Sequence, residues 1–593
     1  MPHQHQTHIW AVGDGEKVRR DDLANPNRDG NSVWDGHTVR LFGARNETIA
    51  FQLIVESQNS PIPSLSVEMS ELRHRNYENA FIRNELAHPD DPNDYVGRRI
   101  EVFTQHYLYV PDELSTPPQW FYSASAPPLQ MSGWIPDALI PHNARVGFGG
   151  QPVAVQPRAN QGFWIDIYVP NDDALPPGLY TGAITVTMHD HNETTIPVEL
   201  QLFDFALPQE THTKTMVYAS DVSSYFPKLD APKDALRKMA QRHRFNLVGD
   251  DVHGRAFDET ALQAYRPYLD GSFFSRANGY EGPGEGVGEQ IFPVGMYGSP
   301  VLGEEPAQMQ AEADKWVNWF HQQKEAYGWN GAYFLYLIDE PRVDKFPWIQ
   351  EQCSAIKSSE GPGRELPILT TRGFAQALEG SIDIWCSSHV TSEGKAGADR
   401  NGQPVWFYNG YRPSHGSIIL EGDAVDMRVN SWLKWKHNIE LYFVWHGTHW
   451  RHNHQGPRGR TNQNVYGYPV TFMYINTNQN DEFYYGGDGV HWGNGDGILF
   501  YPGHDPFYRE QDRGIQAPIS SIRMKNLRRG IQDYEYMWLA ARQGKREQVD
   551  AIVNEAIPRV LHETDRDQDI AWSPVGSDWD GYRKNLADLL SRN

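Results

Sequence analysis

Residues 332–341 read Ala-Tyr-Phe-Leu-Tyr-Leu-Ile-Asp-Glu-Pro, an apolar run followed by two acids and a proline. A continuous apolar run of this length is typical of a strand buried on both faces, as in a parallel sheet covered by helices. The run therefore predicts a central strand at residues 332–338, and it places Asp339 and Glu340 at the carboxyl end of that strand.

On both sides of this strand, short apolar runs alternate with amphipathic stretches. Further strands are expected at residues 215–219, 246–249, 366–370, 382–386, 405–408, 439–445 and 498–501. Helices are expected at residues 233–243, 308–327, 346–357 and 424–436. Roughly eight alternations of strand and helix predict a distorted (β/α)8 barrel over residues 209–515. The stretch at about residues 271–303 is rich in Gly, Tyr and Pro and is expected to be a long loop.

The N-terminal third of the chain has a different pattern. Apolar and polar residues alternate there, and turn residues separate the runs. These patterns predict strands at residues 50–56, 163–169, 183–188 and 196–203. Several short strands of this kind indicate a β-sandwich over residues 1–208.

The last part of the chain, residues 516–593, shows helical periodicity. It is expected to pack as helices on the flank of the barrel. Arg528, Asp533 and Glu535 lie in this region and are expected to form a structural ion-pair network between helix and barrel.

The composition favours a carbohydrate ligand. The formal net charge of −23 opposes binding to nucleic acid and to anionic membrane surfaces. Aromatic residues make up 12% of the chain, with 19 Trp and 29 Tyr. Flat rings with a polar handle stack well on the apolar faces of sugars. No apolar run reaches the length of a membrane span.

Other features bear on the compartment. Cys353 and Cys386 are too few for a disulfide framework and are expected to be reduced core thiols. The first residues lack the basic and apolar segments of a signal peptide. As the sequence stands, a soluble cytoplasmic protein is expected, whereas a secreted or periplasmic protein without its leader has the same appearance. The oligomeric state is left open.

Asp339 and Glu340 are the candidates for catalysis. In (β/α)8 barrels the catalytic groups lie at the carboxyl ends of the strands. Two neighbouring carboxylates there repel each other and are partly desolvated, so one of them is expected to have a raised pKa and to act as a general acid. The alternative is a surface turn with two solvated acids, and the buried strand before the pair favours catalysis.

The spacing of the pair restricts the mechanism. Glycosidases with two separate carboxylates place them on opposite sides of the scissile bond, about 5 Å apart for retention and farther apart for inversion. Neighbouring residues do not flank a bond easily, but they suit the substrate-assisted exception, in which the 2-acetamido oxygen of the sugar attacks the anomeric carbon. Asp339 would orient the acetamide, and Glu340 would protonate the leaving oxygen and then activate water.

Fragments along most of the chain share a family pattern. They lie at residues 9–12, 16–20, 177–182, 205–208, 337–341, 383–385, 405–408, 495–497, 501–502, 523 and 527–535. In this order they resemble the family 123 glycoside hydrolases and the related domain-of-unknown-function family 4091. The resemblance implies a β-sandwich followed by a barrel, and retaining β-N-acetylgalactosaminidase activity. It also implies that Asp339 orients the acetamide and that Glu340 is the acid and base.

We therefore expect a retaining, exo-acting glycoside hydrolase that needs no cofactor. It would release a terminal β-linked 2-acetamido sugar, N-acetylgalactosamine in the first place, from an oligosaccharide or glycoconjugate. One alternative is a glycosidase for sugars without the acetamide, with Asp250, Asp251 or Asp383 as a separate nucleophile. A second alternative is a non-catalytic glycan-binding protein.

Other strand ends offer candidates for sugar binding. Trp385, Tyr408 and Trp445 each close an apolar strand, so each is placed to line a sugar subsite. Asn409 and Asp496 carry groups that bond to hydroxyls. For each of these residues, packing in the core or in a solvated loop is the competing interpretation.

Two further candidates lie in loops. Arg372 follows the strand expected at residues 366–370 and is placed to bond to sugar hydroxyls. The segment 446–454 holds four histidines, a spacing at which imidazoles can share a metal ion. Because no second ligand cluster accompanies the segment, we expect no metal there and assign His446 to substrate hydrogen bonding.

Overall fold

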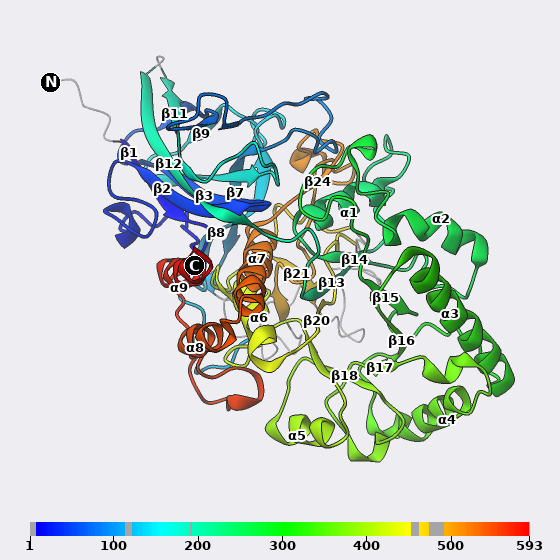
Figure 1. The fold of residues 1–593 in the computed structure, drawn as a ribbon. Coiled ribbons are helices and arrows are strands. Elements are labelled where there is room, and N and C mark those ends of the chain that lie inside the picture. The colour runs from blue at the N-terminus through cyan, green and yellow to red at the C-terminus, as the bar shows by residue number, and fades with distance from the viewer. Residues whose placement is uncertain (1–6, 113–120, 190–191, 452–461, 474–490, 592–593) are drawn as a thin grey trace.

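The computed structural model describes residues 7–112, 121–189, 192–451, 462–473 and 491–591. An N-terminal pair of β-sheets lies beside a parallel barrel, and C-terminal helices lie against both (Figure 1). The predicted fold class, a sandwich followed by a distorted (β/α)8 barrel, is confirmed. The boundaries proposed at residues 208 and 515 stay predictions.

The first sheet of the sandwich is antiparallel, with the strand order β1–β3–β10–β7–β8. Its strands are β1 (Thr7–Gly13), β3 (Glu47–Ser57), β7 (Ile100–Val110), β8 (Gly133–Pro141) and β10 (Ala159–Val169). The second sheet has the order β2–β12–β11–β4–β9, with β5 and β6 attached to β11. Its strands are β2 (Val39–Arg45), β4 (Ile62–Met69), β5 (Leu72–His74), β6 (Phe81–Ile82), β9 (Val153–Val155), β11 (Gly178–Met188) and β12 (Asn192–Ala206).

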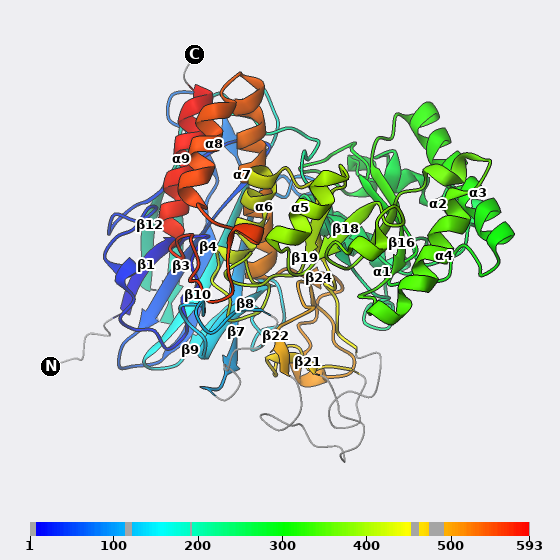
Figure 2. The same cartoon turned by 90° about the horizontal axis from the view of Figure 1, so that it is seen from below.

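The first sheet is covered on both faces. Every residue of β3 is buried, although a sandwich strand commonly has one polar face toward water. One face packs on the second sheet, and the other carries Ala50 and Trp164 against Ile522 at the start of α7 (Ile522–Arg542). The first sheet therefore forms a middle layer between the second sheet and the helical part of the molecule (Figure 1). Seen from below, the sandwich and the barrel lie side by side, with α7 between them (Figure 2).

The barrel is a sheet of parallel strands in the order β14–β13–β20–β19–β18–β17–β16–β15. Its strands are β13 (Lys214–Tyr218), β14 (Asn246–Val248), β15 (Ile291–Val294), β16 (Ala332–Ile338), β17 (Ile368–Thr370), β18 (Ile384–Ser387), β19 (Val405–Tyr408) and β20 (Leu441–Val444). This order follows the chain around a circle and leaves a seam between β14 and β15. The strand predicted at residues 332–338 is β16, which lies in this sheet between β15 and β17.

Two strand predictions are wrong. β15 lies inside the stretch that was expected to be a loop. It was not predicted because Pro293 and the surrounding glycines disfavour a strand. Ala332 N donates to Gln290 O at 2.8 Å, so by the alternation of the ladder the nitrogen of Pro293 faces the open seam, where a missing N–H costs little. The run at residues 498–501 is not a barrel strand. Tyr501–Pro502 forms β23, which pairs antiparallel with β24 (Pro518–Ile519).

Helices cover the outside of the barrel. Four occur where they were predicted: α1 (Pro232–Arg242), α3 (Pro306–Tyr327), α4 (Phe346–Lys357) and α6 (Asp426–His437). Two more are α2 (Glu259–Leu269) and α5 (Ser392–Arg400). Between β17 and β18 only a 3-10 turn at Gln376–Leu378 occurs, which makes the barrel irregular. A small hairpin of β21 (Val470–Met473) and β22 (His491–Asn494) follows β20.

The C-terminal helices are α7, α8 (Arg546–Ala556) and α9 (Gly576–Ser591). α7 packs along α6. Two guanidinium groups of α7 reach the sandwich: Arg528 pairs with Asp166 of β10 at 2.7 Å, and Arg529 pairs with Glu47 of β3 at 2.6 Å. The prediction that Arg528 forms an ion pair with the barrel is wrong, because its partner Asp166 lies in the sandwich.

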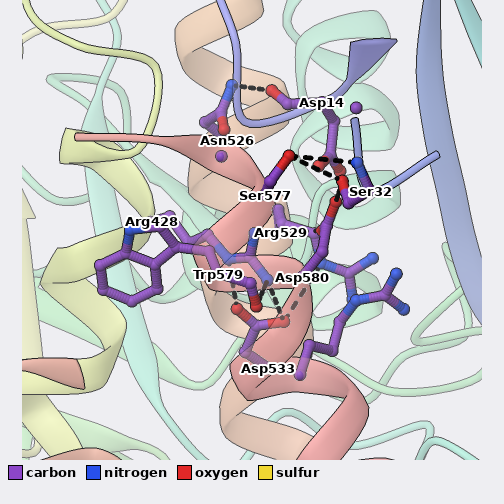
Figure 3. A network of polar contacts seen from close by, with 12 residues as sticks. Asp14, Ser32, Arg428, Asn526, Arg529, Asp533, Ser577, Trp579 and Asp580 are labelled. Atoms are coloured by element: carbon purple, nitrogen blue, oxygen red, sulfur yellow. Dashed lines mark hydrogen bonds and ion pairs between the residues drawn. The ribbon is translucent and has the colours of Figure 1, made fainter. Parts of the chain in front are cut away.

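The barrel side of α7 is held by the other two residues of the predicted network. Asp533 pairs with Arg428 of α6 at 2.6 Å, and Glu535 accepts from His212 N at 2.7 Å just before β13. Figure 3 shows Arg428 and Asp533 together with residues of the sandwich and of α9 that meet at this junction. α7 therefore connects the two parts of the molecule through buried ion pairs.

Cys353 and Cys386 are both buried and unpaired with each other, as expected. Within the described ranges, no helix is both long and apolar enough to cross a membrane.

Candidate active site

The carboxyl ends of the barrel strands meet at one mouth, and their last residues bring polar and aromatic side chains together. Those that contact one another there are Tyr218 at the end of β13, Tyr297 after β15, Asp339 and Glu340 after β16, Thr371 after β17, Tyr408 at the end of β19, and Trp445 after β20. Catalytic groups of barrel enzymes occupy this end of the fold.

One oxygen of Asp339 is held by two hydroxyls. Oδ1 accepts a hydrogen bond from Tyr336 at 2.6 Å and another from Thr371 Oγ1 at 2.7 Å. Tyr336 and Thr371 are buried, whereas Asp339 itself is exposed in the mouth. The two donors therefore fix one oxygen of a carboxyl group that is itself open to the mouth.

Glu340 is held from the other side of the mouth. Its Oε1 accepts a hydrogen bond from the hydroxyl of Tyr408, and its backbone N donates to Thr371 Oγ1 at 2.7 Å. The low-dielectric surroundings raise the pKa of Glu340, the Tyr408 hydroxyl lowers it, and the nearby charge of Asp339 raises it again. The net effect is a raised pKa, as a general acid requires.

The backbone explains how two neighbouring residues serve one site. Successive side chains of a strand point to opposite faces. Glu340 departs from the strand with a φ of +41°, in the left-handed region that non-glycine residues rarely adopt. In addition, the register between β16 and β17 shifts between Tyr336 and Ile338. The chain is therefore turned so that Thr371 Oγ1 contacts the carboxylate of Asp339 and the backbone N of Glu340, while the carboxylate of Glu340 reaches Tyr408.

Aromatic rings surround the pair. The ring of Tyr297 lies 5.1 Å from that of Tyr218 and 5.6 Å from that of Tyr336, and its hydroxyl donates to Trp445 O. Burial and the nearby charge of Asp339 raise the pKa of Tyr297, so this hydroxyl stays protonated. These tyrosines form a neutral wall beside the carboxylates.

Trp445 is oriented by two of the predicted residues. Its indole Nε1 donates to Asp496 Oδ1 at 2.7 Å, and its backbone N donates to Asn409 Oδ1 at 3.1 Å. Asp496 is buried, and burial raises its pKa to about 7. Asp496 and Asn409 thus support the tryptophan, and direct contact of either with a sugar stays a prediction.

Two predicted binding residues lie elsewhere. Trp385 is fully buried, and its Nε1 donates to Gln403 Oε1 at 2.8 Å. Its ring packs on Phe374 on the outer side of the barrel, so the prediction that it lines a subsite is wrong. Arg372 donates to Pro341 O at 2.7 Å. It braces the turn after Glu340 from the side.

Two candidates for a separate nucleophile are engaged in ion pairs. Asp383 precedes β18 and therefore lies at the amino end of the barrel, where it pairs with Lys357 at 2.8 Å. Asp251 pairs with Arg237 at 3.0 Å and with Lys233 at 3.1 Å. Asp383 lies at the wrong end of the barrel for this role, and Asp251, neutralised by two cations, is a poor nucleophile.

Asp250 is the third candidate, and it does lie at the mouth. It follows β14, is exposed, and accepts a hydrogen bond from the hydroxyl of Tyr218. It is close enough to Tyr297 to contribute, with Asp339, to the raised pKa of that tyrosine. Of the three candidates for a separate nucleophile, Asp250 is therefore the one that remains open to the mouth that holds Asp339 and Glu340.

The histidine-rich segment is described only up to residue 451, and His452 and His454 lie outside the described residues. His446 is buried, with its ring 4.8 Å from that of Tyr218 and 5.0 Å from that of His449. Burial and the neighbouring His449 lower the pKa of His446, which keeps it neutral. In the part of the chain that is described, no group of three or more His, Cys, Asp or Glu is arranged to hold a metal ion.

Several residues of the mouth were missed by the sequence analysis. Tyr336 shares the inward face of β16 with Ile338, and the strand's period of two would have found it. Thr371 follows an expected strand, but it has neither a charged group nor an aromatic ring that would indicate a role in the site. Tyr297 lies next to the unrecognised strand β15, so nothing in the sequence placed it at the mouth.

A parallel barrel with paired carboxylates and aromatic rings at its carboxyl-end mouth is typical of enzymes that cleave glycosidic bonds. Residues 315–540 match the model of the glycoside hydrolase 123 catalytic domain. The protein is therefore a glycoside hydrolase, and this segment belongs to family 123, which confirms the resemblance found in the sequence.

The match to one solved structure supports the same fold. A family 123 glycoside hydrolase from Clostridium perfringens matches with a TM-score of 0.62 at 12% identity, over 98% of this chain and 98% of that chain. A family 39 glycoside hydrolase from Bacteroides cellulosilyticus matches at a TM-score of 0.25 and 12% identity, over 58% of this chain and 70% of that one. No curated protein sequence matches the chain.

Proposed function

We propose that the protein releases a terminal β-linked 2-acetamido sugar, N-acetylgalactosamine in the first place, with retention of configuration. The observation that carries the proposal is the geometry of the pair. Asp339 and Glu340 are neighbours after one strand, and one threonine hydroxyl bonds to the carboxylate of Asp339 and to the backbone N of Glu340. The two side chains therefore start from the same point of the mouth and do not flank a bound sugar. Such a pair suits catalysis in which the substrate supplies its own nucleophile.

In the first step the free oxygen of Asp339 accepts the N–H of the acetamide and turns its carbonyl oxygen toward the anomeric carbon. That oxygen forms a bond to C1 while the bond from C1 to the leaving oxygen breaks. Glu340 gives its proton to the leaving oxygen. The product is an oxazolinium ion, whose positive charge lies beside Asp339.

In the second step Glu340, now ionised, takes a proton from water, and the water oxygen attacks C1. The bond from C1 to the acetamide oxygen breaks, and the acetamide is restored. Two displacements at C1 give overall retention. The raised pKa of Glu340 supports its role as the acid, because it keeps the carboxyl protonated closer to neutral pH.

The substrate class is proposed from the relative. The Clostridium perfringens enzyme hydrolyses glycolipid glycans. We propose a glycoconjugate of this kind as the substrate here, cleaved at its terminal sugar. The steps above need no cofactor.

Asp250 supports a second candidate function. As an exposed carboxylate at the same mouth, it could attack C1 directly in a sugar that lacks the acetamide, with Glu340 as the acid. This reaction would also give retention if the carboxylates lie about 5 Å apart across the bond.

A panel of aryl glycosides separates the two candidates. It contains β-N-acetylgalactosaminide, β-N-acetylglucosaminide and β-galactoside, assayed with the wild type and with Asp339→Asn, Glu340→Gln and Asp250→Asn. Cleavage of the acetamido sugars alone, lost in the first two variants, is the expected result. Equal cleavage of the β-galactoside, lost in Asp250→Asn, would overturn the proposal.

A further inference from the structure

Thr371 contacts both members of the carboxylate pair through one atom. Its Oγ1 donates to Asp339 Oδ1 at 2.7 Å and accepts from Glu340 N at 2.7 Å. A threonine hydroxyl has one proton and two lone pairs, so both contacts are made at the same time. The result is a chain of hydrogen bonds from the backbone of Glu340, through Thr371, to the carboxylate of Asp339.

Besides these two contacts, Thr371 interacts with the hydroxyl of Tyr336, which bonds to the same oxygen of Asp339. Thr371 is buried below the mouth, 3% exposed, so it has no access to a sugar. It follows β17, which pairs with β16. The register of this pair shifts between Tyr336 and Ile338, just before Asp339 and Glu340. Its neighbour Thr370 is also buried, but Thr370 Oγ1 donates to Ile338 O at 3.2 Å and reaches neither carboxylate.

The contact with Glu340 bears on the backbone. The left-handed conformation at φ +41° is unfavourable for a residue with a side chain, and it persists where the surroundings compensate for it. The N–H of Glu340 needs an acceptor in this turn, and Thr371 supplies it. The same hydroxyl, polarised by that N–H, becomes a better donor to Asp339.

We propose that Thr371 is the positioning residue that sets the relative geometry of Asp339 and Glu340. The inference rests on the proposed function, because it assumes that these carboxylates act together on the substrate. Thr371 acts through them: it holds Asp339 Oδ1 so that the second oxygen faces the acetamide, and it holds the turn that directs Glu340 toward Tyr408.

Valine and serine substitutions test the hydroxyl itself. Thr371→Val keeps the shape of the side chain and removes both hydrogen bonds, whereas Thr371→Ser keeps the hydroxyl. Loss of a hydrogen bond to a charged group corresponds to roughly 10- to 100-fold in rate, so we expect kcat of Thr371→Val to fall by about that factor with little change in KM. Thr371→Ser should stay within about threefold of the wild type, because serine preserves the bonds.

Thr370→Val is the matched control. It makes the same substitution one residue earlier, in an equally buried position, and it should change kcat by no more than about threefold because no carboxylate is involved. If Thr371→Val does not fold, as judged by circular dichroism and thermal unfolding, Thr371→Ala is measured by the same criteria.

Two readouts separate positioning from a general structural effect. A thiazoline analogue of the oxazolinium ion should lose affinity in Thr371→Val by about the factor lost in kcat, because Asp339 no longer meets it correctly. In the double variant Asp339→Asn/Thr371→Val, the second change should add little to the first, since both act on one contact.

Three results would overturn the inference: a Thr371→Val enzyme as active as Thr370→Val, a Thr371→Ser enzyme as impaired as Thr371→Val, or fully additive losses in the double variant. Failure of the proposed function is recognised separately. In that case Asp339→Asn would itself retain full activity, and the thiazoline would not bind the wild type.

Discussion

Acidic side chains gather along α7 and in the mouth of the barrel, and different groups hold them in the two places. Asp533 on α7 is fully buried and paired with Arg428 at 2.6 Å. Asp339 and Glu340 are exposed, and tyrosine and threonine hydroxyls hold them. Across the described ranges, neither of the two forms an ion pair with Lys or Arg.

The difference shows in the acidity of the carboxyls. Burial raises the pKa of Asp533, but the charges of Arg428 and Arg529 outweigh it and hold that pKa below its ordinary value. Desolvation by the walls of the mouth raises the pKa of Glu340, although its side chain is open to solvent, and no cation offsets this effect. Guanidinium groups thus fix a carboxylate in its ionised form, whereas neutral hydroxyls orient a carboxyl group and leave its proton free to exchange.

Neutralising the pair in the mouth should have the largest effect. Asp339→Asn and Glu340→Gln should each lower kcat/KM by about 10²- to 10⁴-fold, the usual contribution of a positioned acid or base. Because like charges are removed, the free energy of unfolding should stay the same or rise by up to about 1 kcal/mol. Steady-state kinetics on the aryl β-N-acetylgalactosaminide and thermal unfolding measure the two quantities. A large loss of stability instead would mean that the pair is structural.

The corresponding change in α7 should do the reverse. Asp533→Asn removes the carboxylate nearest to buried Arg428 and leaves Arg529 with Glu47 alone, which should lower the free energy of unfolding by about 3–5 kcal/mol. The kcat/KM of the folded fraction should not change. Denaturant titration with parallel assays tests this.

Asp399→Asn in α5 is the control for that variant. Asp399 pairs with Lys395 at the surface, where Asp399 is 56% exposed, and an exposed pair within a helix contributes about 0.5 kcal/mol at most. If both variants lost the same stability, the distinction between buried and exposed pairs would fail in this protein.

A smaller effect is expected at Tyr408. Its hydroxyl lowers the pKa of Glu340, so Tyr408→Phe should raise that pKa further. Since the acid step needs protonated Glu340, the basic limb of the kcat/KM profile should move to higher pH, while the maximum falls by about tenfold for the lost hydrogen bond. Tyr180→Phe, which removes a hydroxyl bonded to Pro176 O in the sandwich, should leave the profile in place. A shift to lower pH would contradict the assignment of Glu340 as the acid.

The same contrast explains what was predictable from the sequence. The strand that ends just before Asp339 was predicted with its bounds, because seven apolar residues followed by two acids leave few other arrangements. Strand β15 was missed because Pro293 and its glycine-rich surroundings argue against a strand, and only its position at the seam makes the proline tolerable.

Site residues were predictable where the residue type itself suggests a chemical role. They were not predictable where the role depends on the direction in which a side chain or the backbone points. Trp385 and Cys386 are neighbours on β18, so they face opposite sides, and the tryptophan faces the outside of the barrel. Thr371 could not be recognised, because its importance comes from a backbone conformation at Glu340 that no residue pattern encodes. Contacts between distant strands decide both cases.

Asp496 should give the smallest effect, because it combines features of both regions. It is as buried as Asp533, yet its pKa is raised to about 7 by burial, and it accepts from Trp445 Nε1 at 2.7 Å. Asp496→Asn keeps an acceptor for the indole, so kcat and KM should stay within about twofold. Asp496→Leu leaves that N–H without its acceptor and should raise KM by about 3- to 10-fold at unchanged kcat. If Asp496→Leu lowered only the thermal stability and left KM unchanged, Trp445 would not bind the sugar, and Asp496 would belong with the structural carboxylates of α7.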